Sequence, residues 1–196
     1  MTTLTRFLSL IILITITTNP VIASAKTAES FITSLGEEVL QIASNKGLNT
    51  TQKEQKISSM FKKNIDFQWI GGFVLGKHKR SASTEQITRY NKAYEGFIVR
   101  SYGSRFKDYA GETFKIISSD PQGAGKHLVK TEIIRPAESN ILVDYKVKKA
   151  GSSFKVYDII VEGVSLITTQ RSEFNSVINR KDLNTLISAL EKKAGA

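Results

Sequence analysis

The spacing of apolar residues changes near the middle of this 196-residue chain. Up to about residue 109 they recur every three or four positions, whereas from residue 113 they alternate with polar residues. The first pattern predicts amphipathic helices, and the second predicts antiparallel strands with one buried face. We therefore expect an α+β domain in which a helical N-terminal half packs on a strongly bent antiparallel sheet of about four strands.

The longest expected helix begins after Ser83, which has Gln86 three residues later and so predicts a capping box. Its apolar stripe continues for about six turns, to Tyr109, and is rich in tyrosine. We expect this helix to cover the inner face of the sheet. Three shorter helices should precede it, and Asp66 is expected to cap the one over residues 67–75.

Four strands are expected, over residues 113–119, 126–135, 141–148 and 153–162. In the fourth strand, Phe154, Val156 and Ile160 should share one face with Asp158. An unpaired buried carboxylate is costly, so Asp158 should form an ion pair. Two short helices should close the chain.

The first 25 residues are typical of a secretory signal peptide. Arg6 precedes an apolar run from Leu8 to Ile16, and Ala23-Ser24-Ala25 offers a cleavage site. The run is far shorter than the roughly 20 residues that cross a bilayer. Residues 26–196 should then form a single exported domain.

The composition limits the partners of such a domain. The formal net charge of +10 favours anionic partners, and export argues against nucleic acid. The chain has no cysteine, so it can form no disulfide and carry no lipoprotein acyl anchor. We expect a freely diffusing protein that is monomeric.

Motifs for catalysis are incomplete. Gly163-Val164-Ser165-Leu166-Ile167 lacks the second glycine of a serine-hydrolase elbow, and Gly123 to His127 lacks the first glycine and the hydroxyl residue of a phosphate-binding loop. Two histidines without cysteine disfavour a zinc site. We expect no catalytic residue, no cofactor and no metal ion.

Three segments of the second half form a more specific pattern: Val143-Asp144-Tyr145, the stretch from Phe154 to Ile167, and Arg171-Ser172-Glu173-Phe174. The pattern resembles the signature of the MlaC family, the periplasmic components of the Mla phospholipid transport system. The upstream segments Phe67 to Lys77 and Ser83 to Gln86 agree with it.

The resemblance implies a soluble periplasmic carrier, not an enzyme, that shuttles phospholipids between the outer and inner membranes. Its partners would be an MCE-domain subunit of an inner-membrane ABC transporter and an outer-membrane lipoprotein and porin complex. Acyl chains would lie in an apolar cavity between the tyrosine-rich helix and the sheet, with Gly163 at its lip. The expected lining is Trp69, Phe73, Tyr94, Ile98, Tyr102, Ile133, Val143, Tyr145, Val156, Ile160, Val164 and Leu166.

Several alternatives remain open. The ligand of a family member could be a hopanoid in place of a phospholipid. A small cone-shaped enzyme could use Asp158 or Asp144 as its general acid or base. A structural adaptor with a filled core would also fit the basic surface.

At the end of the fourth expected strand, the side chains of Ser165, Thr168 and Thr169 are expected to form hydrogen bonds with nearby backbone groups.

Overall fold

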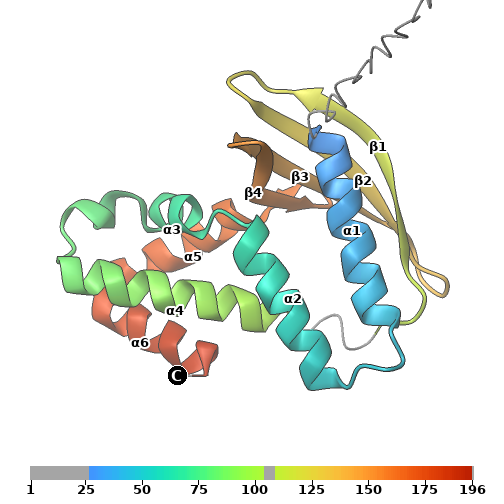
Figure 1. The fold of residues 1–196 in the computed structure, drawn as a ribbon. Helices are drawn as coiled ribbons and strands as arrows, with labels where there is room; N and C mark the ends of the chain where they lie inside the picture. Colours follow the sequence, from blue (N-terminus) through green and yellow to red (C-terminus); the bar gives the residue numbers. More distant parts are fainter. Residues whose placement is uncertain (1–26, 104–108, 196) are drawn as a thin grey trace, which may run out of the picture.

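The computed structural model describes residues 27–103 and 109–195 (Figure 1). The predicted signal peptide lies outside these residues. So do residues 104–108, over which the long helix was expected to continue. That helix is therefore followed only as far as Gly103.

The order of the elements agrees with the expected α+β plan, with helices first, then strands, then two closing helices. The helices are α1 (Ala28–Ser44), α2 (Thr50–Asn64), α3 (Phe67–Leu75), the 3-10 helix η1 (Gly76–Arg80), α4 (Thr84–Gly103), α5 (Leu166–Arg180) and α6 (Leu183–Ala194). The strands are β1 (Thr113–Pro121), β2 (Lys126–Ile134), β3 (Ile141–Ala150), β4 (Ser153–Val161) and β5 (Val164–Ser165).

Helix starts are set by side chains that accept the free N–H groups of the first turn. The Ser83 hydroxyl accepts from the Gln86 N–H at 3.1 Å, and the Gln86 side chain accepts from the Ser83 N–H at 3.0 Å. The Asp66 carboxylate accepts from the Trp69 N–H at 3.0 Å. Both predicted caps are confirmed.

The sheet is antiparallel throughout, in the order β1-β2-β3-β4-β5. The expected four strands are present, and a fifth, β5, folds back on β4 through a tight turn at Glu162 and Gly163. Both turn residues have positive φ, 48° and 79°, as a two-residue hairpin requires. Gly163, expected at the lip of a cavity, lies in this turn at the end of β4.

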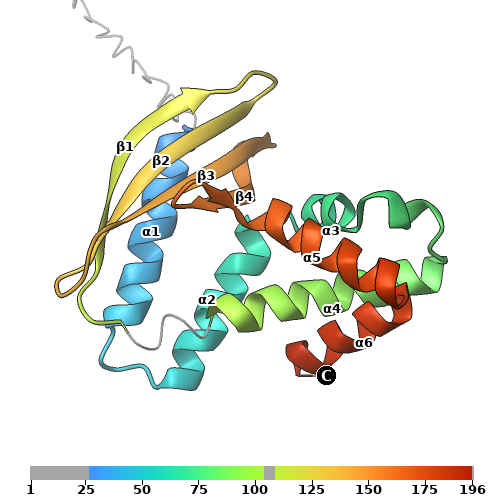
Figure 2. The same cartoon turned by 180° about the vertical axis from the view of Figure 1, so that it is seen from behind.

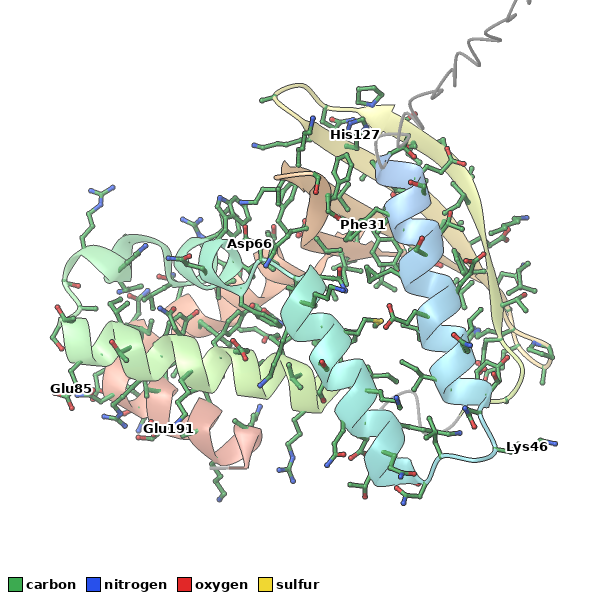
Figure 3. All side chains as sticks on the ribbon, in the orientation of Figure 1. Phe31, Lys46, Asp66, Glu85, His127 and Glu191 are labelled. Atoms are coloured by element: carbon green, nitrogen blue, oxygen red, sulfur yellow. The ribbon has the colours of Figure 1, made fainter. Side chains whose placement is uncertain are left out.

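Helix α1 covers one face of the sheet, which we call the inner face (Figure 2). Phe31 of α1 points to this face (Figure 3) and is 1% exposed. It packs, with Ala28 and Ile32, on Val129, Val147, Phe154 and Val156. This is the first of two cores, the sheet core.

The expectation that the long helix covers the inner face is wrong. Helix α4 packs chiefly on α6 and also on α2 and α3. Its Tyr90 and Tyr94 are 0% and 1% exposed, in a second core formed with Leu186 and Ile187 of α6. An amphipathic stripe shows that a helix is buried on one side, but not which surface buries it.

The expectation that Phe154, Val156, Asp158 and Ile160 share one face of the sheet is also wrong, because β4 contains a β-bulge. Val147 pairs with Val156, but the preceding residue, Lys146, pairs with Asp158, which leaves Tyr157 as an extra residue. The bulge reverses the alternation beyond it. Val156 therefore lies on the inner face, whereas Asp158 and Ile160 lie on the outer face.

Candidate functional site

Apolar side chains of four neighbouring strands form a strip on the inner face, beyond the part covered by the sheet core. Direct cross-strand pairs place them on one side: Ile133 with Ile141, Val143 with Val161, and Val161 with Val164. Val143 is 9% exposed and Val164 is 56% exposed. We call these five residues the inner-face strip.

The strip belongs to neither described core. None of its five members is among the residues of the sheet core or of the helical core, or among the partly buried residues packed on them. Ile65, at the end of α2, packs on both cores and joins them. The strip is thus an apolar surface outside both cores, where apolar area removed from water by a ligand would contribute binding free energy.

Polar groups hold the end of the strip in place. The Ser165 hydroxyl accepts from the Thr168 N–H at 3.2 Å and so caps α5. It also donates to the Asp158 carboxylate at 2.9 Å. The Thr169 hydroxyl donates to the Ser165 carbonyl at 3.0 Å. For Ser165 and Thr169 the expected bonds to local backbone groups are confirmed, whereas the Thr168 hydroxyl contacts the Ser165 side chain.

Asp158 is 3% exposed and lies 3.3 Å from the Lys146 ammonium. The predicted ion pair is confirmed. Both carboxylate oxygens of Asp158 also accept from Ser165. Asp144, the other candidate acid or base, pairs across the strands with Lys130 and Ile160 on the outer face. In the described residues, no cluster of three or more histidine and acidic side chains could hold a metal ion.

The structure places only some of the expected lining residues together. Ile133, Val143 and Val164 belong to the strip, and Tyr145 and Val156 share its face but pack with α1 in the sheet core. Burial raises the pKa of Tyr145 to about 12. Three expected lining residues lie on helices and are half-buried. Ile98 and Tyr102 are in the last turns of α4, and Leu166 is the first residue of α5.

Four expected lining residues lie elsewhere. Trp69 and Phe73 stack on each other at the outer side of α3, with ring centroids 5.4 Å apart. Tyr94 lies in the helical core, where its hydroxyl donates to the buried Gln170 side chain and burial raises its pKa. Ile160 is on the outer face because of the bulge.

Two strip residues, Ile141 and Val161, were absent from the expected lining. Ile141 alternates with Val143 and Tyr145, so its place on this face follows from the sequence pattern. Val161 does not, because strict alternation along β4 from Val156 would put it on the outer face. The bulge at Tyr157 carries no clear signal in the sequence.

Two surface hollows lie along α2, and neither is lined by any of the twelve expected residues. One, of about 480 Å³, lies between α2 and the C-terminal half of α1, and the other, of about 420 Å³, lies on α2 itself. A cavity between the helical half and the sheet therefore stays a prediction. No helix in the described residues combines the length and apolar character needed to cross a membrane.

These features define an α+β domain in which an antiparallel sheet carries an apolar strip beside a helical subdomain, and in which the buried Asp158 carboxylate pairs with Lys146. The sequence model of the MlaC protein family matches residues 33–192. The chain belongs to the MlaC family.

Individual relatives agree with this assignment. The intermembrane phospholipid transport system binding protein MlaC of Haemophilus influenzae is 25% identical over 134 residues. The match covers 66% of this chain and 63% of that protein. The fold is similar to that of the phospholipid-binding protein from Ralstonia solanacearum, solved in complex with a phospholipid. The TM-score is 0.75 at 20% identity, over 87% of this chain and 98% of that one.

Proposed function

We propose that the protein is a periplasmic carrier that binds phospholipid by sheltering acyl chains against the inner-face strip. The observation that carries the proposal is the strip itself: five apolar residues on one sheet face that belong to neither core, in a chain of the MlaC family. The Ralstonia relative, whose fold is similar, was solved with a phospholipid bound.

The energy of an exposed acyl chain explains why a carrier needs such a surface. Each methylene group exposed to water costs about 0.8 kcal/mol, so a sixteen-carbon tail needs shelter worth on the order of 12 kcal/mol. Polar recognition of a head group alone does not supply this. The apolar surface of the carrier must therefore be large, and must extend beyond the strip.

The remaining lining would come from the helical side. We assign Ile98 and Tyr102 of α4 and Leu166 of α5 to it, because all three are half-buried apolar or amphipathic side chains. Acyl chains would lie between these residues and the strip. Trp69, Phe73, Tyr94 and Ile160 are not part of this proposed lining.

Membership of the family supports a proposal for the wider role. The Haemophilus relative is named as the binding protein of an intermembrane phospholipid transport system. We propose that this protein is exported with a cleaved signal peptide and exchanges phospholipid with two partners. These are an MCE-domain subunit of an inner-membrane ABC transporter and an outer-membrane lipoprotein and porin complex.

The function is tested by native mass spectrometry of the purified mature protein, followed by extraction and identification of its lipids. The proposal predicts a phospholipid that remains bound to the folded chain at near one molecule per chain. A folded chain that carries no lipid, and takes none up from phospholipid vesicles, contradicts the proposal. Recovery of a hopanoid would assign a different ligand class to the same surface.

A further inference from the structure

Three aromatic rings gather where β4 meets α3: Phe73 and Tyr157 are partly buried against the helical core, and Trp69 is the exposed member. Trp69 stacks on Phe73, one turn further along α3, and the Tyr157 ring meets the Trp69 ring edge-on at 5.1 Å. The bulge of β4 leaves Tyr157 unpaired at this place. Trp69 is 38% exposed, so part of this apolar surface faces water.

A row of three lysines crosses the sheet beside these rings. Lys148 of β3 lies directly opposite Lys126 of β2 on one side and Lys155 of β4 on the other. Like charges in directly opposed positions destabilise a sheet. The row therefore lowers the stability of the free protein, which is a reason to look for an anionic partner.

Contacts with the rings hold two of the three lysines at the aromatic surface. The Lys148 ammonium lies 5.4 Å from the centre of the Trp69 ring, and the Lys126 ammonium 5.8 Å from the centre of the Tyr157 ring. Arg171 of α5 lies over the Phe73 ring at 4.7 Å. Rings and cations thus form one continuous surface.

Asp66 offsets part of this charge. It lies at the start of α3 (Figure 3), and its carboxylate is 2.7 Å from the Lys148 ammonium. Burial acts to raise the pKa of Asp66, but hydrogen bonds from Lys148 and from the Trp69 N–H hold the pKa below its usual value. Within the described residues neither Lys126 nor Lys155 forms an ion pair, although the charge of Lys155 also helps to lower the Asp66 pKa.

We propose that this aromatic–lysine patch docks the protein on an anionic lipid surface. The patch consists of Trp69, Phe73, Tyr157, Lys126, Lys148 and Lys155. Lysines near an anionic bilayer each gain roughly 1 kcal/mol, and tryptophan and tyrosine rings favour the head-group region of a bilayer.

The composition favours lipid over a protein partner. Lysine is depleted in protein–protein interfaces, where arginine and aromatic residues predominate, whereas the cations of this surface are three lysines and one arginine, Arg171. A bilayer accepts flexible lysine side chains without a fixed geometry, because its anionic head groups move. A protein face would have to supply a matching carboxylate for each one.

The patch and the proposed acyl-chain site are separate. Lys126, Lys148 and Lys155 lie on the outer face of the sheet, and the inner-face strip lies on the opposite face. Docking therefore goes beyond the carrier function, and either proposal can fail while the other survives.

The test uses the fluorescence of Trp69, which is the only tryptophan in the chain. Purified mature protein is mixed with vesicles of phosphatidylethanolamine and phosphatidylglycerol, and in parallel with vesicles of phosphatidylcholine. We expect a blue shift and co-sedimentation with the anionic vesicles only, both weakened by high salt. The shift should persist in Val164→Glu, which separates docking from occupation of the acyl-chain site.

The charge of the patch is tested with the double variant Lys126→Glu/Lys155→Glu. Both new carboxylates would face Lys148, so the variant should fold at least as well as the parent. We expect its affinity for anionic vesicles to fall by roughly ten-fold or more. The control is Lys46→Glu/Lys192→Glu, which makes the same change in net charge at two exposed positions outside the patch.

Three results would overturn the proposal. The first is no blue shift and no co-sedimentation with anionic vesicles. The second is equal loss of binding in the patch and control variants, which would show that net charge alone drives association. The third is a blue shift with polyglutamate at concentrations where anionic vesicles give none, which would assign the patch to an acidic protein partner.

The lipid bound by the patch variant, measured by native mass spectrometry, should equal that of the parent, because the patch and the proposed acyl-chain site lie on opposite faces of the sheet.

Discussion

The buried carboxylate of Asp158 lies 3.3 Å from the ammonium of Lys146, and the Ser165 hydroxyl donates to the same carboxylate. The contact joins neighbouring strands of the sheet to the first turn of α5. It therefore ties the end of the inner-face strip to the helical subdomain. Held in this way, the Asp158 carboxylate contributes to the structure of the sheet and to its junction with α5.

The two ends of this ion pair should respond differently to mutation. Lys146→Met leaves a buried carboxylate without its cation and should lower the free energy of unfolding by about 2–3 kcal/mol. Asp158→Asn leaves a lysine whose side chain is 38% exposed, so its cost should be smaller, about 1–2 kcal/mol. Urea denaturation of both variants measures the difference. Equal, negligible losses would contradict the structural role.

Close packing of α1 on the sheet gives a second prediction. A Cβ atom added at Gly36 would lie 2.3 Å from atoms of the Phe114 ring, so Gly36→Ala should destabilise the fold by about 1–2 kcal/mol despite the higher helix propensity of alanine. Gly72→Ala in α3 is the matched control. Its Cβ would meet only the end of the Lys79 side chain, at 3.4 Å, and should add about 0.5–1 kcal/mol. Thermal unfolding that shows the same sign for both would refute this packing.

Much of the fold follows from local signals in the sequence. The caps at Asp66 and Ser83 and the alternation along β3 depend on neighbouring residues, so they could be predicted with correct positions. The partner of each helix could not. The apolar stripe of α4 predicts that Tyr94 is buried, but such a stripe can pack on a sheet or on another helix. In this structure α4 packs on α6.

The candidate site was harder to predict than the fold, because it depends on register. One extra residue, Tyr157, moves Ile160 to the outer face and Val161 to the inner face. Trp69 and Phe73 are apolar and were expected to line a cavity, but α3 presents them on the outer side beside Tyr157. Alternation predicts a face only up to the first bulge.

The alkaline stability of the protein gives a third prediction. Burial raises the pKa of Tyr145 to about 12, against about 10 in the unfolded chain. As the pH rises above about 10, the Tyr145 hydroxyl loses its proton in the unfolded chain before it does so in the folded protein. The stabilisation from the raised pKa is therefore complete below about pH 10 and is lost as the pH rises through about 12. Lysines titrate in the same range, so the comparison needs Tyr145→Phe, in which the decline between about pH 9 and about pH 11 should be less steep. Parallel slopes in urea denaturation would contradict the raised pKa.

The central claim is that phospholipid binds at the inner-face strip. Val164 is 56% exposed, so Val164→Glu should cost little stability but place a charge on the strip. Ile117, 53% exposed on β1 at the opposite edge of the sheet, gives the matched control Ile117→Glu. The decisive measurement is the phospholipid bound per folded chain, by native mass spectrometry, in the parent and both variants. The account predicts loss of lipid in Val164→Glu and parental content in Ile117→Glu, and unchanged lipid in a folded Val164→Glu would contradict it.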